Sequence, residues 1–375
     1  MKIALIGPGI MPIPPQGWGA IESLLWNYKN FLERMGHTVE IFNSRDLRGV
    51  AATINNGSYD FIQAHFDEHI EDLNRLLTQA YCNSTHRGFF LNTAMWGSHG
   101  WKVYFNSLRS PGIIALSGKV AERYRKDGYR GFLRVLRNGA DCDRFRFGEQ
   151  GNGRAICLGK IEKGDRKSQV LLSRMLRDRV PVDFVGPCEN PDFHADGMCR
   201  YLGAWDKETV HKHLTDYSCL LLISQGELAP LVVPEALSAG LSLVVSEAAS
   251  ANLDPKPFIS VLPDDCQDPD VLSETVHRQM AGNGGYREAI RKYAKEHFDW
   301  QVIMLEYLKL IEQFNAGPRK LQAGSFLVAL TGARCRLREF VSKRLPREVK
   351  QRLKWLWGRM CSAGKRGTCC GKDSL

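Results

Sequence analysis

Residues 224–240 of this chain read Ser224-Gln-Gly-Glu-Leu-Ala-Pro-Leu-Val-Val-Pro-Glu-Ala-Leu-Ser-Ala-Gly240. Short apolar runs at 219–224 and 241–246 flank this segment, and both are typical of buried parallel strands. The order strand, loop, helix, strand places the loop at the carboxyl ends of the strands, where open α/β sheets bind ligands. The segment therefore predicts an α/β fold with a ligand site in this loop.

Two carboxylates, Glu227 and Glu235, lie in this loop and in the helix that follows it. A helix that begins near residues 230–234 directs unpaired N–H groups and the positive end of its dipole toward the ligand site. Such a terminus binds a phosphate, and the two carboxylates accept hydrogen bonds from hydroxyl groups. The pattern favours a ligand that carries both groups, such as a sugar nucleotide. The alternative is that both glutamates are solvated residues at the helix end.

The composition is that of a soluble globular protein. The 375 residues, 43% hydrophobic and 25% charged, suit two domains of ordinary size. No apolar run approaches the ~20 residues that span a bilayer, and Gly7-Pro-Gly9 ends the first apolar run too early for a signal peptide. Residues 319–375 hold 15 Lys and Arg against 3 Asp and Glu, so the net charge of +10 is concentrated in a basic tail.

Eleven cysteines are scattered through the chain without framework spacing. Cys157 and Cys219 fall inside expected strands, which indicates buried, reduced thiols and a reducing compartment, so we expect a cytoplasmic protein. No Cys-x-x-Cys pair or His-x-His cluster suggests a metal site, and we expect neither a metal nor a cofactor.

Apolar runs and amphipathic stretches alternate along the first part of the chain, as in a βαβ series with a parallel sheet. The polar, glycine-rich residues 148–153 form the expected linker, so a first domain is expected over residues 1–148. The predicted strands are at residues 3–6, 38–42, 60–64, 89–93, 113–117 and 133–136, and the predicted helices are at 20–35, 68–81 and 119–127.

A second βα series is expected over residues 149–298. Two doubly wound sheets in tandem leave a cleft between them, the usual place for a two-substrate site. A last helix is expected at 301–314, within residues 299–317, and the basic tail is 318–375. The second domain's predicted strands are at residues 155–158, 182–185, 220–223, 242–246 and 259–262, and its predicted helices are at 167–177, 207–216, 270–280 and 286–297.

Two further segments have residues that suit phosphate binding. Gly17 and Gly19 come just before a helix, where the backbone can approach a phosphate closely, or they are ordinary turn residues. Lys160, Arg166 and Lys167 directly follow a strand, where cations can neutralise a diphosphate leaving group, or they form a solvated basic turn.

In this order, the segments resemble the family 4 retaining glycosyltransferases of GT-B architecture. The resemblance covers roughly residues 1–315. It implies two Rossmann-like domains that face a cleft, with helix 301–314 crossing back onto the first domain. The matching motifs are the glycine loop Gly17-Trp-Gly-Ala-Ile-Glu22, the segment Val135-Leu-Arg-Asn-Gly-Ala-Asp141 with Phe145, the donor-phosphate segment Gly159-Lys-Ile-Glu162 with Arg166-Lys167, and the E-x7-E element from Glu227 to Glu235.

The resemblance also implies roles for these residues. Glu227 contacts the transferred sugar, and Glu235 contacts the ribose of the donor. The diphosphate is held by cationic side chains and by backbone N–H groups, and no metal takes part. The phosphate contacts implied in this way come from Lys160, Lys167 and the backbone at Gly19, Leu231 and Val232, and Gly17 and Arg166 are further donor-binding residues.

The donor-phosphate segment departs from the family pattern in two ways. Lys160 stands where the family usually has arginine, and a lysine offers a point charge where an arginine offers a bidentate fork. The segment also carries extra residues between its two cations, which we place at Gly164-Asp165.

Two histidines are candidates for the acceptor side. His99 lies in a loop after an expected strand and resembles the family's cleft histidine, so it is the candidate for orienting the acceptor hydroxyl or relaying its proton. His65 follows an earlier strand and is the weaker candidate. The alternative for each is a packed or surface histidine.

The tail contains an apolar stripe with interspersed Lys and Arg at residues 332–360, interrupted at Pro346, and Trp355 and Trp357 near its end. Such amphipathic helices suit an anionic membrane surface, or they pack on the protein or a partner. Nucleic-acid binding is not expected, because no groove-binding motif accompanies the charge. Cys369-Cys370 is a weak candidate for acylation.

The sequence therefore predicts an enzyme that moves a sugar from a nucleotide-sugar donor to a glycan, lipid or other hydroxyl acceptor. The anomeric configuration is retained and no metal is needed. It is expected in the cytoplasm, with peripheral membrane association through the tail as one reading. The alternatives are another GT-B activity, such as a sugar-nucleotide epimerase or a phosphorylase, and a catalytically idle nucleotide- or glycan-binding protein docked on membranes.

Overall fold

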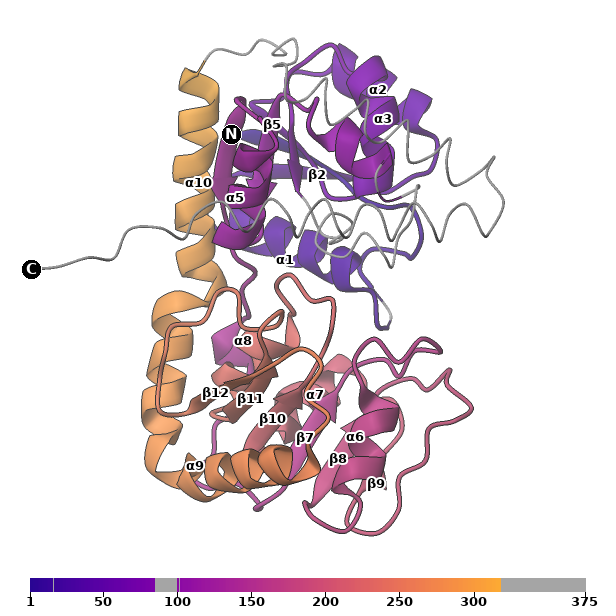
Figure 1. Cartoon of the computed structure of the whole chain (residues 1–375). Helices are drawn as coiled ribbons and strands as arrows, with labels where there is room; N and C mark the ends of the chain where they lie inside the picture. Colours follow the sequence, from indigo (N-terminus) through magenta and orange to yellow (C-terminus); the bar gives the residue numbers. More distant parts are fainter. Residues whose placement is uncertain (16, 85–99, 101, 318–375) are drawn as a thin grey trace, which may run out of the picture.

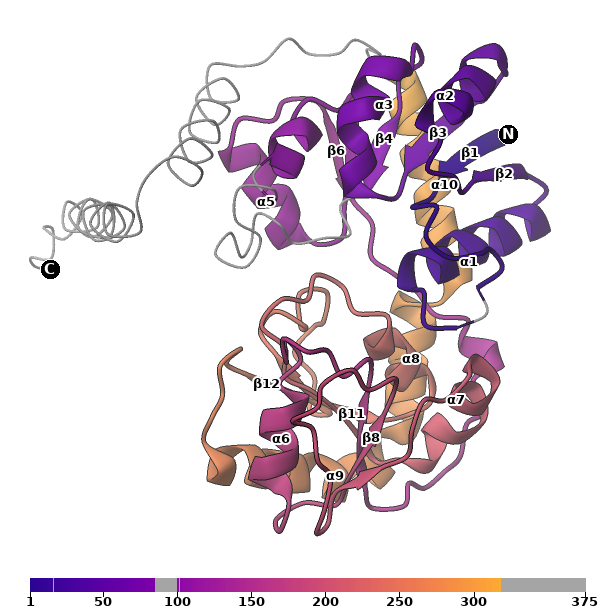
Figure 2. The same cartoon turned by 90° about the vertical axis from the view of Figure 1, so that its right-hand side faces the viewer.

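The computed structural model describes residues 1–15, 17–84, 100 and 102–317. These residues form two α/β domains, each built on a six-stranded sheet, and every strand pair is parallel (Figure 1). In two views of the molecule, α1 (Ala20–Arg34) of the first domain and α8 (Val232–Ser238) of the second lie on the sides where the domains face each other (Figures 1 and 2).

The first sheet has the strand order β2-β1-β3-β4-β5-β6. The order reverses between β1 and β3, so the loops after these two strands border a topological switch point, where open α/β sheets bind ligands. Its strands are β1 (Lys2–Ile6), β2 (Thr38–Phe42), β3 (Phe61–Ala64), β4 (Cys82–Ser84), β5 (Gly112–Ala115) and β6 (Phe132–Val135). Its helices include α2 (Leu47–Asn56), α3 (Ile70–Leu76), α5 (Gly118–Lys126) and the 3₁₀ turns η1 (Asp67–His69) and η2 (Cys142–Arg144).

The second sheet has the order β12-β11-β10-β7-β8-β9, which is the 3-2-1-4-5-6 order of dinucleotide-binding domains. Its switch point lies between β7 and β10. The strands are β7 (Ala155–Leu158), β8 (Val182–Val185), β9 (Arg200–Tyr201), β10 (Cys219–Leu222), β11 (Ser242–Ser246) and β12 (Ile259–Leu262). The helices include α6 (Gln169–Leu176), α7 (Lys207–His213), η3 (Leu214–Asp216) and α9 (Pro269–His297).

The last described helix, α10 (Trp300–Ala316), follows the second domain in sequence but packs on the first (Figure 1). Its inner face is largely apolar: Trp300, Ile303 and Tyr307 are at most 1% exposed and share one core with the strands and α1 of the first domain. Tyr28 of α1 contacts both Trp300 and Tyr307 edge-on. Burial of these aromatic side chains fixes the chain's return to the first domain.

The second domain corrects one prediction: residues 270–280 and 286–297 belong to a single helix, α9, rather than to two. Three glycines, at positions 282, 284 and 285, signalled a break because each costs about 1 kcal/mol in a helix. Buried side chains on the same stretch outweigh that cost. Asn283 donates to the Gly240 carbonyl at 2.9 Å, and the Arg287 guanidinium donates to the carbonyls of Gly148, Thr215, Tyr217 and Ala239.

In the first domain, β4 is formed by residues 82–84, and the strand predicted at 89–93 lies outside the described residues. The short strand escaped prediction because Asn83 and Ser84 are polar. Both are nevertheless buried, and Ser84 Oγ accepts a hydrogen bond from Gln63 Nε2 at 2.5 Å. Helix α2 was also not predicted, and α3 is shorter than the helix expected at 68–81.

Cys157 and Cys219 are buried free thiols in β7 and β10, as predicted. In the part of the chain that the structure describes, no helix is long and apolar enough to cross a bilayer. The basic tail, including the stripe at 332–360 and Cys369-Cys370, lies outside that part.

Candidate functional site

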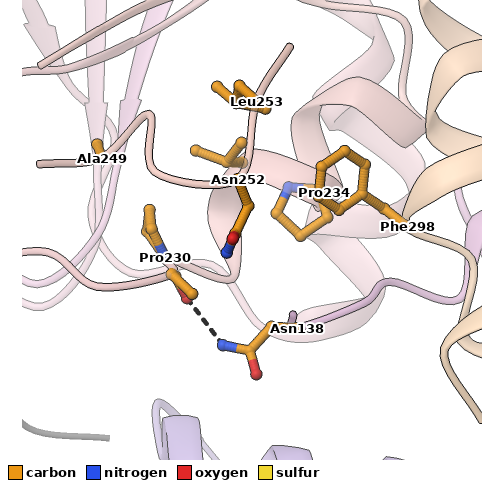
Figure 3. Close-up of a pocket in the computed structure, with 9 residues that line it drawn as sticks. Asn138, Pro230, Pro234, Ala249, Asn252, Leu253 and Phe298 are labelled. Carbon is orange, nitrogen blue, oxygen red and sulfur yellow. Dashed lines mark hydrogen bonds between the residues drawn. The ribbon is translucent and has the colours of Figure 1, made fainter. Parts of the chain in front are cut away.

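The segment from Glu227 to Glu235 lies between the domains. It follows β10 at the carboxyl end of the second sheet, next to the switch point. Leu228, only 5% exposed, packs into a core of the first domain. The Ala229 carbonyl accepts a hydrogen bond from Asn138 Nδ2 at 2.8 Å (Figure 3). The loop therefore belongs to the second domain in sequence but is held in place by the first.

Glu227 forms an ion pair with Arg166, with Arg166 Nη1 2.9 Å from Glu227 Oε1. Burial lowers the pKa of the Arg166 guanidinium, but Glu227 and Glu162 outweigh this effect and raise it. The Glu227 side chain keeps 14% of its surface exposed. Sequence reasoning placed both residues at the donor site, and the structure brings them into direct contact.

Glu235 lies in the first turn of α8, which begins at Val232, inside the range predicted for the helix start. Burial raises the pKa of the Glu235 carboxyl from 4.5 to about 7, and the Lys207 charge opposes this rise. Leu231, the residue before the helix, provides no side-chain cap. The first N–H groups of a helix lack intrahelical acceptors, so those of Leu231 and Val232 are suited to an anion.

Lys160 and Lys167 follow β7 on the other side of the switch point. Lys160 Nζ is 2.6 Å from Glu189 Oε1, and both side chains are largely exposed. Lys167 Nζ lies directly over the Cα of Gly159, where a Cβ would meet it at 2.8 Å. Lys167 makes no hydrogen bond or ion pair with the residues that the structure describes. The Lys167 ammonium is therefore the better placed of the two to receive a phosphate.

The glycine-rich loop leads into α1, and Gly19 is the N-cap residue of that helix. A Cβ on Gly19 would lie 2.8 Å from Glu22 Oε2, whereas a Cβ on Gly17 would meet nothing within 4 Å. Glu22 is 4% exposed, and its Oε1 accepts a hydrogen bond from Met11 N at 3.3 Å. A side chain at position 19 would therefore displace the Glu22 carboxylate, while Gly17 borders open space.

The two acceptor-side histidines have different outcomes. His65 directly follows β3 at the switch point of the first sheet, but it is 1% exposed and packs edge-on against Tyr28 of α1. Its ring is therefore part of the domain interior, which is the packed alternative given for this histidine. His99 lies outside the described residues.

Lys207, Ser23 and Asn138 are parts of the site that sequence reasoning did not assign. Lys207 Nζ, at the first residue of α7, donates to Ser23 Oγ of α1 at 2.5 Å. The signal for Asn138 was its place in the segment 135–141, whereas nothing in the sequence pairs Lys207 with Ser23 across 184 residues.

A small pocket opens beside the Glu227–Glu235 segment (Figure 3). Its walls are mostly apolar, and it lies where Asn138, the start of α8 and the loop at 249–253 meet. Asn252, on one wall, donates to the Leu116 carbonyl of the first domain at 2.8 Å. The lining residues include Asn138, Pro230, Pro234, Asn252, Leu253 and Phe298.

No protein-family model matches the sequence, and no curated protein matches it. Solved structures do match in shape over nearly the whole described region. They include a sucrose-phosphate synthase from Thermosynechococcus elongatus, with a TM-score of 0.65, 15% identity, and coverage of 84% of this chain and 99% of that one. The Anabaena protein HepE in complex with UDP-glucose has a TM-score of 0.65, 15% identity, and coverage of 84% and 100%.

A lipopolysaccharide outer core galactosyltransferase, WaaB, is similar as well, with a TM-score of 0.62, 14% identity, and coverage of 84% and 99%. These matches agree with the two parallel sheets and their arrangement. The chain has the GT-B fold. In this GT-B protein the E-x7-E segment and the glycine loop each meet the opposite domain, through the Asn138–Ala229 and Trp18–Trp205 hydrogen bonds. The two lysines follow β7 at the switch point of the second sheet.

Proposed function

We propose that this protein is a glycosyltransferase that moves a sugar from a nucleotide-sugar donor to a hydroxyl acceptor, with retention of the anomeric configuration and without a metal. The observation that carries the proposal is the placement of Glu227 and Glu235. Both lie at the switch point of a sheet with dinucleotide-binding order, on a loop held against the other domain. HepE, a structural neighbour, is described in complex with UDP-glucose.

In this proposal the second domain holds the donor. Glu235, in the first turn of α8, accepts hydrogen bonds from the ribose hydroxyls, and Glu227 accepts them from the hydroxyls of the transferred sugar. The diphosphate lies between the N-terminus of α8 and the Lys167 and Lys160 ammonium groups. Gly19 and Gly17 approach it from the first domain, so closure over the donor brings both halves of the site together.

The reaction proposed for this site is a single displacement of the phosphate at the anomeric carbon. The bond between the anomeric carbon and the phosphate oxygen breaks, and a bond to the acceptor oxygen forms on the same face of the sugar. The acceptor's proton passes to the leaving phosphate oxygen. Lys160, Lys167 and the α8 N–H groups stabilise the charge that develops on the diphosphate, which is the largest contribution expected of a site without a metal.

The test begins with ligand binding. A thermal-shift panel of UDP, GDP, ADP and CDP, alone and as their common sugar conjugates, identifies the donor class, because a ligand that binds the native state raises the melting temperature. We expect one base to respond, and UDP is the first to try because HepE is described with it. Transfer to candidate glycan and lipid-linked acceptors follows, in the presence of EDTA.

Glu227→Gln is the decisive variant. We expect it to fold with a small loss in melting temperature, because the ion pair with Arg166 is broken, and to lose at least ~100-fold in transfer, the scale seen when one preorganised group at a reacting centre is removed. Glu247→Gln serves as a control because it removes a carboxylate from another surface turn of the same domain. Normal turnover by Glu227→Gln, or no response to any nucleotide at millimolar concentration, would refute the proposal.

A further inference from the structure

Arg166 has nearly all of its donors in use without any ligand. Its Nε and Nη2 donate to the two oxygens of Glu162, at 3.3 and 3.2 Å. Its Nη1 donates to Glu227 Oε1 at 2.9 Å and to the Gly226 carbonyl at 3.3 Å. The guanidinium therefore spans from one carboxylate, in its own loop, to the other, in the loop after β10. Its side chain is 23% exposed, so solvent screens the pair only in part.

The backbone around Arg166 holds the same two loops together. The Arg166 carbonyl accepts from Gln225 N at 3.1 Å and from Ser224 Oγ at 3.3 Å. On either side, Asp165 and Ser168 adopt φ values of 44° and 53°, a left-handed conformation that non-glycine residues rarely take. Surrounding contacts must impose this backbone, and Asp165 supplies one by accepting from Val170 N at the start of α6. The backbone contacts around Arg166 thus fix the direction of its side chain.

The neighbouring Lys167 offers a direct contrast. Its ammonium lies over Gly159 and has no partner among the described residues, so it can receive a phosphate without breaking an existing bond. Arg166 would have to give up bonds to Glu162, Glu227 or Gly226 to do the same. Loss of a charge-assisted hydrogen bond at a partly buried site offsets much of what a new phosphate contact provides.

We propose that Arg166 is a positioning residue for Glu227, which it holds in the orientation that receives the hydroxyls of the transferred sugar, and that it is not a phosphate ligand. This inference rests on the proposed function of Glu227 in sugar binding. It gives a role to the extra residues Gly164-Asp165. Through the left-handed turn at Asp165 they set Arg166 against Glu227, while Lys167 stays with the phosphates.

Two ligands separate the two roles of an arginine at this position. A phosphate ligand contributes to the binding of a bare nucleoside diphosphate, whereas a residue that orients Glu227 contributes only when the sugar is attached. Calorimetric titration of the responding nucleoside diphosphate and steady-state turnover of its sugar conjugate would be measured on the parent, Arg166→Gln, Glu227→Gln and the double variant. Lys167→Gln is the positive control for phosphate binding, and Arg174→Gln, on the exposed side of α6, is the matched surface control.

We expect Arg166→Gln to bind the bare diphosphate within about 2-fold of the parent and to lose about 10-fold or more in turnover of the sugar conjugate, or roughly 1.4 kcal/mol. In the Glu227→Gln background, the same substitution should change neither quantity further, because the group that Arg166 orients is gone. Arg166→Lys, which keeps one charged donor, should restore part of the turnover. A 10-fold loss of bare diphosphate affinity in both backgrounds would overturn the inference and make Arg166 a phosphate ligand.

A ligand-free measurement tests the pair independently. Melting temperatures of the same four proteins form a double-mutant cycle, and we expect the double variant to be clearly less destabilised than the sum of the single variants. Additive effects would overturn the inference, because they would mean that Arg166 and Glu227 do not interact in solution. If the parent protein binds no nucleotide at all, the proposed function fails, and the role of Arg166 in sugar binding fails with it, whatever the cycle shows.

Discussion

Lys207 donates a hydrogen bond to Ser23 Oγ at 2.5 Å and thereby joins the second domain to the helix that follows the glycine-rich loop of the first. Ser23 Oγ in turn donates to the Gly19 carbonyl at 2.6 Å, so a chain of two hydrogen bonds runs from α7 to the N-cap of α1. The Lys207 residue as a whole is exposed, yet its ammonium end lies between the domains. Desolvation there lowers the Lys207 pKa, against the opposing effect of Glu235.

Glu235 should make the stability of the protein depend on pH. Its pKa is about 7 in the folded protein and 4.5 ordinarily, so the folded state binds the proton more tightly. A raised pKa contributes stability that is fully present below pH 4.5 and is lost as the pH rises through about 7. Between pH 4.5 and 8, we expect urea unfolding to show the free energy of unfolding of the parent falling by up to about 3 kcal/mol relative to that of Glu235→Gln. A constant difference over this range would contradict the prediction.

The same proton should control donor binding. Protonated Glu235 cannot accept hydrogen bonds from both ribose hydroxyls, so nucleoside diphosphate affinity should fall as the pH drops from 8 to 6. Lys207→Met removes the cation that lowers the Glu235 pKa, so the midpoint of this loss should move to higher pH. Ser23→Ala breaks the interdomain bond but keeps the charge, so its midpoint should stay near that of the parent. Titrations at several pH values decide this, and identical midpoints for all three proteins would refute the role of Lys207.

Gly186 should tolerate no side chain. It directly follows β8 and has φ of 144°, and a Cβ there would lie 2.2 Å from the Gly159 carbonyl oxygen, at the start of the donor-phosphate segment. Gly186→Ala should displace Gly159 and Lys160, weaken nucleotide binding and destabilise the protein by more than about 1 kcal/mol. Gly284→Ala, in α9 with open space around it, is the control of opposite sign and should stabilise by about 1 kcal/mol. Thermal unfolding and nucleotide titration of both variants give the comparison.

Arg287 should be among the most important residues for stability. It is 1% exposed, and its loss would leave the carbonyls of Gly148, Thr215, Tyr217 and Ala239 without their donor. Unsatisfied buried acceptors cost about 1–3 kcal/mol each, so Arg287→Met should lower the free energy of unfolding by about 3 kcal/mol or more. Arg278→Met, on the exposed side of the same helix, should change it by less than about 0.5 kcal/mol. Equal effects in urea unfolding would mean that α9 does not depend on this network.

Much of the architecture was predictable because buried parallel strands are short, apolar and bounded by turns. β1, β7, β8 and β11 follow that rule, and all four were predicted to within one residue. β4 breaks the rule, because Asn83 and Ser84 are polar and only their buried surroundings make the strand. For helices the corresponding exception is α9, because its glycines predict an interruption that the Asn283 and Arg287 hydrogen bonds prevent.

The candidate site divides in the same way. The two glutamates, the cations after β7 and the glycines before α1 were found from the sequence, because each motif is local and its chemistry follows from the residues it contains. The contacts that join these groups to distant residues were not predicted: Arg166 pairs with Glu227 across 61 residues, and Lys207 with Ser23 across 184. A local pattern fixes which groups a segment offers and which secondary structure carries them. Contacts between distant segments depend on how the sheets and domains pack, so the environment of Glu235, the orientation of Glu227 and the burial of His65 were settled only by the tertiary structure.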